Sequence, residues 1–121
     1  MTPNEYQKLA LRTDPVTLNR FPFVSDILLP DMRIINGVMG LNGEAGEVID
    51  LVKKSMFQGH DLDREHLAKE LGDVAWYIAA TADAIGYDLE TIFQMNIDKL
   101  RARYPEGFDA DKSIHRADGD V

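Results

Sequence analysis

The chain has 121 residues, no cysteine and a formal net charge of -8, from 21 acidic and 13 basic side chains. This length predicts a single domain, and a hydrophobic content of 45% predicts a globular fold. The lack of cysteine excludes disulfide bonds and thiolate metal sites, and fits a reducing, cytoplasmic location. The acidic balance argues against stable nucleic-acid binding. No apolar run reaches the roughly 20 residues that a membrane span needs.

Residues 1–30 predict a short helix followed by an irregular connection. Thr2 is expected to cap the helix, with Pro3 at its first position and Glu5 completing a capping box. Three prolines then interrupt residues 13–30. Residues 21–29 are apolar, which predicts packing against another part of the protein or another subunit.

Three further helices follow, at about 31–57, 63–85 and 89–104. Each has an apolar stripe with helical spacing. Asp63 and Asp88 are expected to cap the last two helices, and Gly86 to end the helix before Asp88. The stripes comprise Ile34, Val38, Leu41, Ala45, Val48, Val52 and Met56; Leu67, Leu71, Val74, Ile78 and Ile85; and Leu89, Ile92, Phe93, Met95 and Leu100.

The pattern predicts an all-α fold with a single domain over 1–121. Two long antiparallel helices, a third C-terminal helix and the short N-terminal helix form a bundle, with the helical core at 31–108 and a polar tail at 109–121. A bundle this thin is expected to complete its core by oligomerisation.

Two pairs of acids lie at the margins of the first two stripes. Glu44 and Glu47 are three residues apart, as are Glu70 and Asp73, so each pair occupies one helix surface. A pair of this kind on one helix is usually a solvated face. Two pairs on helices that pack antiparallel would instead converge, and four carboxylates together require a cation. Mg²⁺ suits such a site because it takes oxygen ligands.

Glycine recurs every third residue in this stretch, at 37, 40, 43 and 46. Glycine disfavours a helix interior by about 1 kcal/mol relative to alanine. Gly37 and Gly40 share a side with the acids, so close approach of a second backbone or of a ligand would explain them. Gly43 and Gly46 fall on the outer side.

The segments GEAGEVIDLVKK, KELGDVAWY and NIDKLRARYP together resemble the MazG-like nucleoside triphosphate pyrophosphohydrolases, which belong to the all-α NTP pyrophosphatase superfamily. The resemblance covers roughly residues 31–116. It implies an enzyme that uses Mg²⁺, or Mn²⁺, to hydrolyse an NTP or dNTP to the monophosphate and pyrophosphate. Such an activity would serve nucleotide-pool house-cleaning, and relatives with this architecture are dimers.

The resemblance also implies roles for individual residues. Glu44, Glu47, Glu70 and Asp73 would be the catalytic metal ligands. Asn96 and Lys99 match an N-x-x-K element that contacts phosphate or the metal cluster. Further candidates for substrate binding are Lys54 and Arg103. Many relatives carry another Glu at the position of Gly43, so its role is either absent here or filled by another residue.

Several residues have more than one interpretation. Lys99 and Arg103 would also complement the dipole of their helix. Packing or a subunit interface is favoured over base stacking for Trp76 and Tyr77. The three histidines, His60, His66 and His115, are interpreted as surface residues. For the chain as a whole, the alternative to an enzyme is a non-catalytic helical dimer that acts as a binding or regulatory module. The base and sugar preference, and the choice between homodimer and homotetramer, stay open.

Overall fold

The computed structural model describes residues 1–15 and 29–119, and within these the fold is helical throughout, without a strand. The expected all-α class is therefore confirmed. The elements are α1 (Pro3–Ala10), the 3₁₀ turn η1 (Leu11–Thr13), α3 (Leu29–Phe57), α4 (Arg64–Ala84), α5 (Leu89–Arg103) and α6 (Ala110–Ile114). Most of the predicted irregular connection, including nearly all of its apolar part, lies outside the described residues. No described helix has the length and apolar character that crossing a membrane requires.

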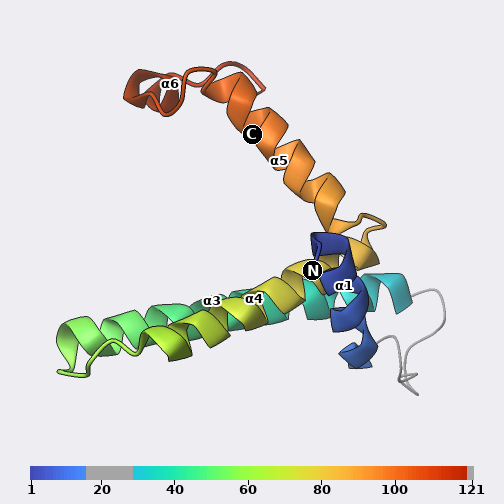
Figure 1. Cartoon of the computed structure of the whole chain (residues 1–121), viewed down its shortest axis with the longest axis vertical. Coiled ribbons are helices and arrows are strands. Elements are labelled where there is room, and N and C mark those ends of the chain that lie inside the picture. Colours follow the sequence, from blue (N-terminus) through green and yellow to red (C-terminus); the bar gives the residue numbers. More distant parts are fainter. Residues whose placement is uncertain (16–28, 120–121) are drawn as a thin grey trace.

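The helices α3 and α4 form a long antiparallel hairpin, as Figure 1 shows. Helix α3 begins at Leu29, two residues before the expected start. Pro30 therefore lies in its first turn, where a missing N–H costs no hydrogen bond. Asp63 caps α4 as predicted, because its carboxylate accepts the backbone N–H of His66 at 2.9 Å. The sequence therefore predicts where α4 begins.

Two of the four regularly spaced glycines explain how closely the hairpin packs. A Cβ built at Gly37 would overlap the side chain of Thr81, and one at Gly40 would overlap the ring of Tyr77. A Cβ at Gly43 or Gly46 would meet nothing within 4 Å. The first pair thus allows side chains of α4 to lie against the α3 backbone, and the second pair leaves an open surface beside the acids.

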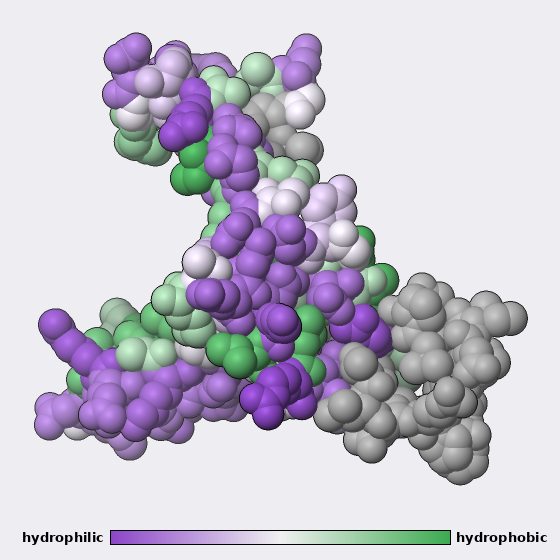
Figure 2. Space-filling model, turned by 45° about the vertical axis from the view of Figure 1, so that its right-hand side comes forward, coloured by the Kyte–Doolittle hydropathy of each residue, from purple (hydrophilic) through white to green (hydrophobic). Residues whose placement is uncertain are grey.

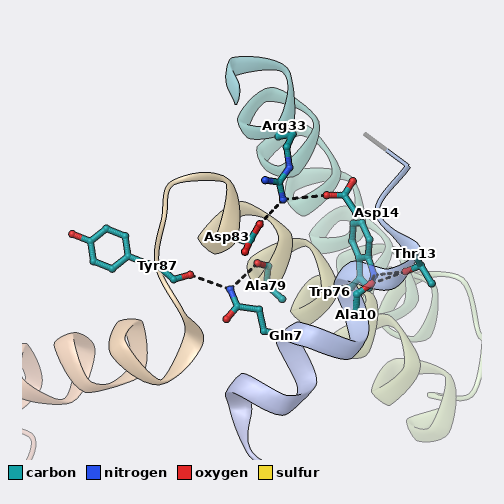
Figure 3. A network of polar contacts seen from close by, with 9 residues as sticks. All are labelled: Gln7, Ala10, Thr13, Asp14, Arg33, Trp76, Ala79, Asp83 and Tyr87. Carbon is teal, nitrogen blue, oxygen red and sulfur yellow. Dashed lines mark hydrogen bonds and ion pairs between the residues drawn. The ribbon is translucent and has the colours of Figure 1, made fainter. Parts of the chain in front are cut away.

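Helix α1 joins the end of the hairpin to the start of α5 through one buried side chain. The capping box of Thr2 and Glu5 forms as expected. The Gln7 amide donates to the carbonyl oxygens of Ala79, at 3.2 Å, and of Tyr87, at 3.0 Å, and its Oε1 accepts the N–H of Leu89 at 3.0 Å. Figure 3 shows the two donated bonds, which hold α1, α4 and the α4–α5 turn together.

An ion-pair network ties the end of η1 to both long helices. Arg33 Nη2 lies 3.3 Å from Asp14 Oδ2 and 2.6 Å from Asp83 Oδ2 (Figure 3). Asp14 is almost completely buried, with 2% exposure. A buried carboxylate needs a partner of opposite charge, so this network fixes where the chain leaves η1.

Helix α5 extends away from the α3–α4 hairpin, and α5 and α6 together are called the arm below. Gly86, at φ +83°, ends α4 as predicted, with Gly86 N–H bonded to Asp83 O and Tyr87 N–H to Ala82 O. The Asp88 carboxylate then caps α5 by accepting the Thr91 N–H at 2.7 Å. Figure 1 shows α5 running away from the α3–α4 hairpin, with α6 at its far end.

The polar tail contains a short helix that the sequence analysis did not predict. Residues 110–114 form the short helix α6, because the Asp109 carboxylate accepts the N–H of Lys112 at 3.0 Å. The cap provides the local hydrogen bond that composition alone did not reveal.

The apolar stripes are buried only in part, which differs from a closed bundle. The buried hydrophobic residues among those described are Ala79, Ala80, Ala82 and Leu89. Eight stripe residues are exposed: Val38, Met56, Leu71, Ile78, Ile85, Phe93, Met95 and Leu100. Figure 2 shows apolar surface both on the arm and on the body of the molecule. One chain therefore leaves part of each stripe exposed.

Candidate active site

Three of the four predicted acids converge between α3 and α4. One carboxylate oxygen from each of Glu44, Glu70 and Asp73 lies within 4.8 Å of the others. Glu44 comes from α3, and Glu70 and Asp73 come from one surface of α4. Antiparallel packing of the hairpin brings these residues together across the helix interface. Glu44 and Glu70 are half-buried, whereas Asp73 is exposed.

Glu47 lies outside this group of three. It is exposed on α3, one turn beyond Glu44. Its charge still acts on the site, since it contributes to raising the pKa of Glu44 and to raising the pKa of Lys54. The expected four-acid cluster is thus assembled as three acids with a fourth close enough to interact electrostatically.

The electrostatics of the cluster favour a bound cation. Loss of solvent raises the pKa of Glu44, and the negative charges of Asp73, Glu70 and Glu47 raise it further. Carboxylate oxygens are hard donors that suit Mg²⁺ or Ca²⁺, and two oxygens on opposite sides of such an ion lie about 4 to 5 Å apart. The spacing of the three acids fits this requirement. A divalent ion would also remove the repulsion between them.

His66 contacts the cluster, although it was interpreted as a surface residue. Its Nε2 lies 2.9 Å from Oε1 of Glu70, one turn further along α4. The His66 side chain is 50% exposed, so its surface position is confirmed and its contact was missed. The spacing of four residues between His66 and Glu70 was the available signal.

The lysines after the first acid pair are held by Asp50. Lys53 and Lys54 both form ion pairs with the Asp50 carboxylate. Hydrogen bonds from Lys53 and then Lys54 lower the pKa of Asp50 to about 2. The hydrogen bond to Asp50 is also the largest cause of the raised pKa of Lys54. Lys54 is half-buried on α3, so a phosphate that binds it would compete with Asp50.

The other three candidates for substrate binding lie on the arm and not beside the acids. Asn96 and Lys99 are exposed and line a cavity of about 310 Å³ with Ile92 and Met95, all on α5. Arg103 lies near the end of α5, with its guanidinium 5.9 Å from the centre of the Tyr104 ring. A single chain therefore does not bring the N-x-x-K element to the carboxylates.

A separate cavity of about 330 Å³ adjoins the acids. Its lining residues are Thr13, Pro15, Glu44, Asp73, Trp76 and Tyr77. The sequence favoured packing or an interface for the two aromatic residues, and both do pack against neighbouring helices. Their rings also form walls next to Glu44 and Asp73, which the helical pattern alone could not show.

The family model of the MazG nucleotide pyrophosphohydrolase domain matches residues 36–108, more than half of the chain and the whole of the acid-bearing hairpin beyond the start of α3. The chain belongs to the MazG family.

A curated relative extends the comparison without adding a function. The chain is 41% identical over 73 residues to the Gene 37 protein of Mycobacterium phage L5. The match covers 57% of this chain and 64% of that protein, so it spans less than two thirds of the relative. No solved structure matches the MazG chain.

Proposed function

We propose that the chain is a divalent-cation-dependent nucleoside triphosphate pyrophosphohydrolase. It would hydrolyse an NTP or dNTP to the monophosphate and pyrophosphate, with Mg²⁺ as the preferred ion and Mn²⁺ as an alternative. The observation that carries this proposal is the convergence of Glu44, Glu70 and Asp73 within 4.8 Å, inside the residues that match the MazG domain. Membership of the family supports this class of reaction, and the convergence of the three carboxylates supports these residues as its site.

The acids would have distinct positions around the reacting phosphates. Glu44, Glu70 and Asp73 would hold the cation, with Glu47 as the remaining ligand on the exposed side. A bound divalent ion neutralises phosphate charge and lowers the pKa of water. Lys54, one turn beyond Asp50, would exchange its ion pair for a phosphate contact when substrate arrives.

We further propose that the active unit is a homodimer or homotetramer in which α5 of one copy serves the acids of another. Two observations support this: the stripe residues exposed on both the hairpin and the arm, and the separation of Asn96 and Lys99 from the carboxylates. Contiguous exposed apolar surface usually marks an interface. A second copy would cover this surface and bring Asn96, Lys99 and Arg103 to the phosphates.

Release of pyrophosphate from a panel of NTPs and dNTPs with Mg²⁺ tests the activity. We expect release by the wild type and none by Asp73→Asn. Glu65→Gln is the matched control, because Glu65 is an exposed acid of the same helix that pairs only with Lys69 among the described residues. Nucleotide binding without pyrophosphate release would support the non-catalytic alternative instead.

Complementation between two impaired variants, assayed at nucleotide concentrations below KM, tests the shared site. Asp73→Asn and Lys99→Ala are mixed under conditions that exchange subunits. If α5 acts on a second copy, half of the randomly formed dimers are mixed and each has one intact site, which restores about a quarter of wild-type activity. No recovery, or an active monomer of 13.6 kDa by light scattering, would place the whole site within one chain.

A further inference from the structure

The cavity beside the acids is bounded by an aromatic corner, formed by Trp76 and Tyr77. The two ring centres are 4.9 Å apart and the ring planes meet at 79°. Asp73, Trp76 and Tyr77 follow one another within about one turn of α4, so the aromatic corner and the carboxylates belong to one continuous surface. A ligand whose phosphates lie at the acids would therefore reach the rings.

The polar edge of Trp76 is already used by the N-terminal segment. The indole Nε1–H donates to Ala10 O at 3.1 Å and to Thr13 Oγ1 at 2.9 Å (Figure 3). The Thr13 hydroxyl in turn donates to Ala10 O at 2.8 Å. These bonds hold the indole plane in place. They also use the donors of the indole and of the Thr13 hydroxyl, so neither group is left to hydrogen-bond the edge of a base.

Tyr77 is held from the other side. Its ring lies against Gly40 of α3, where any side chain would collide with it. Among the described lining residues, the Tyr77 hydroxyl is then the remaining neutral donor, since Glu44 and Asp73 are acids. The cavity thus offers a ligand two aromatic rings and the Tyr77 hydroxyl beside the carboxylates of Glu44 and Asp73.

We propose that the aromatic corner is the subsite for the nucleobase, and that it holds the base by stacking with little discrimination among bases. This inference rests on the proposed function and deepens it, because the sequence left base preference open. Stacking on an aromatic side chain tolerates any base, since every base has a π face. Selection between bases requires hydrogen bonds to their edges. The Trp76 indole and the Thr13 hydroxyl are already bonded, so the Tyr77 hydroxyl is the one neutral donor left for such a bond among the described lining residues.

The intrinsic fluorescence of the protein gives a direct test, because Trp76 is its only tryptophan. Nucleoside monophosphates carrying each of the common bases are titrated in the presence of Mg²⁺. We expect each to quench the fluorescence, with dissociation constants within about tenfold of one another. Ribose 5-phosphate and inorganic pyrophosphate, which lack a base, should leave it unchanged.

Variants distinguish a loss of stacking on Trp76 from a loss of the hydrogen bond that holds the indole in the cavity wall. Trp76→Leu should lower kcat/KM for all bases by roughly 5- to 150-fold. Thr13→Val removes the hydroxyl that anchors the indole but keeps the ring, and should cost much less. Tyr77→Phe should not change the order of preference among bases.

Three outcomes would overturn the proposal: equal quenching by the phosphates without a base, a more than hundredfold spread among bases, or a Thr13→Val loss equal to that of Trp76→Leu. Failure of this subsite is distinct from failure of the proposed function. Pyrophosphate release without quenching contradicts the subsite alone, whereas quenching without pyrophosphate release contradicts the activity alone.

A second, independent inference concerns His66. Its backbone N–H is bonded to the Asp63 cap at 2.9 Å, and its Nε2 lies 2.9 Å from the Glu70 carboxylate. An ionised carboxylate only accepts hydrogen bonds, so Nε2 is the donor. Both ends of His66 are therefore fixed, and one of them fixes Glu70.

We propose that His66 is a positioning residue that sets the orientation of the Glu70 carboxylate toward Glu44 and Asp73. Groups that hydrogen-bond to metal ligands orient them, and their loss typically weakens metal binding by about 10- to 100-fold. Glu70 is only 16% exposed by its side chain, whereas His66 is 50% exposed. The exposed histidine thus holds the half-buried ligand.

The chain contains a matched control for this contact. His115 makes the same contact across one helical turn, with its Nδ1 3.0 Å from Asp111 on α6, away from the acids. Mn²⁺ affinity is measured by titration calorimetry without nucleotide, at one pH, for His66→Leu and His115→Leu. We expect about 10- to 100-fold weaker binding for the first and no change for the second.

The variant His66→Gln should recover part of the affinity, since its amide can donate to Glu70. Unchanged Mn²⁺ affinity in His66→Leu would show that the His66–Glu70 contact is an ordinary pair on a helix surface, and would overturn the proposal. Loss of affinity in both leucine variants would indicate a general loss of helical structure and would equally overturn the proposal.

Discussion

The hairpin and the arm of this molecule each carry some of the predicted site residues, and only the hairpin brings its own together. In the hairpin, α3 and α4 bring Glu44, Glu70 and Asp73 within 4.8 Å of one another inside a single chain. On the arm, Asn96 and Lys99 line a cavity together with residues of α5 alone, and neighbouring apolar residues are exposed. The difference teaches that packing within one chain is enough to bring the acids together, whereas it does not bring Asn96 and Lys99 to them.

Replacing single acids of the hairpin should give the largest effect. We expect Asp73→Asn and Glu70→Gln to lower kcat by more than about 100-fold. Loss of a group that only hydrogen-bonds to a metal ligand typically costs about 10- to 100-fold, and loss of the proposed ligand itself should cost more. Lys99→Ala on the arm should cost less and act mostly through KM. Glu47→Gln should also abolish activity if the fourth acid completes the site. Steady-state pyrophosphate release measures all four, and normal turnover in Asp73→Asn would remove the proposed site.

Divalent cations should stabilise the hairpin and not the arm. An ion that binds only the folded state at 100 times its dissociation constant adds about 2.7 kcal/mol of stability. We expect Mg²⁺ or Mn²⁺ to raise the Tm of chelator-stripped protein, and hydrogen exchange to slow in α3 and α4 but not in α5. The Glu70→Gln variant should lose the response. Equal protection of the arm would contradict the comparison.

The glycines of α3 allow the packing of the hairpin to be tested within one helix. Gly40→Ala places a Cβ against the Tyr77 ring and should destabilise the fold by about 1 to 3 kcal/mol. Gly43→Ala meets open space and should stabilise it by up to about 1 kcal/mol through helix propensity. Urea unfolding compares the two. Changes of opposite sign in the free energy of unfolding would support close packing at Gly40 and an open surface at Gly43. Equal changes would refute this difference between the two positions.

The smallest expected effect is a pH dependence of the metal-free hairpin. Because the folded protein raises the pKa of Glu44 above its usual 4.5, the folded state holds the proton more tightly than the unfolded state. Stability should therefore fall as pH rises from 4.5 through the raised pKa. Glu44→Gln should be more stable than wild type at pH 7 without metal, and the difference should vanish below about pH 4.5. Melting curves in chelator, with and without Mg²⁺, measure this.

Helix positions and their ends follow from the sequence, because they depend on local interactions. Thr2, Asp63 and Asp88 cap helices where the pattern predicted, and Gly86 ends α4 because its positive φ suits glycine. The acid pairs were also visible locally, since a spacing of three residues places each pair on one helix surface. The resemblance to the MazG family depends on these same short segments, so the sequence alone was enough to indicate it.

Only the tertiary structure decided which residues meet across helices. Convergence of three acids, with Glu47 outside, depends on the rotation of α3 against α4, which Gly37 and Gly40 permit and periodicity does not specify. The aromatic corner next to Glu44 depends on η1 reaching the indole of Trp76. The separation of the arm depends on Gln7, a single buried amide that joins α1, α4 and the start of α5. Contacts between residues some 70 to 80 positions apart leave no periodic trace in the sequence, because the helical pattern reports which face of each helix is apolar and not what that face touches.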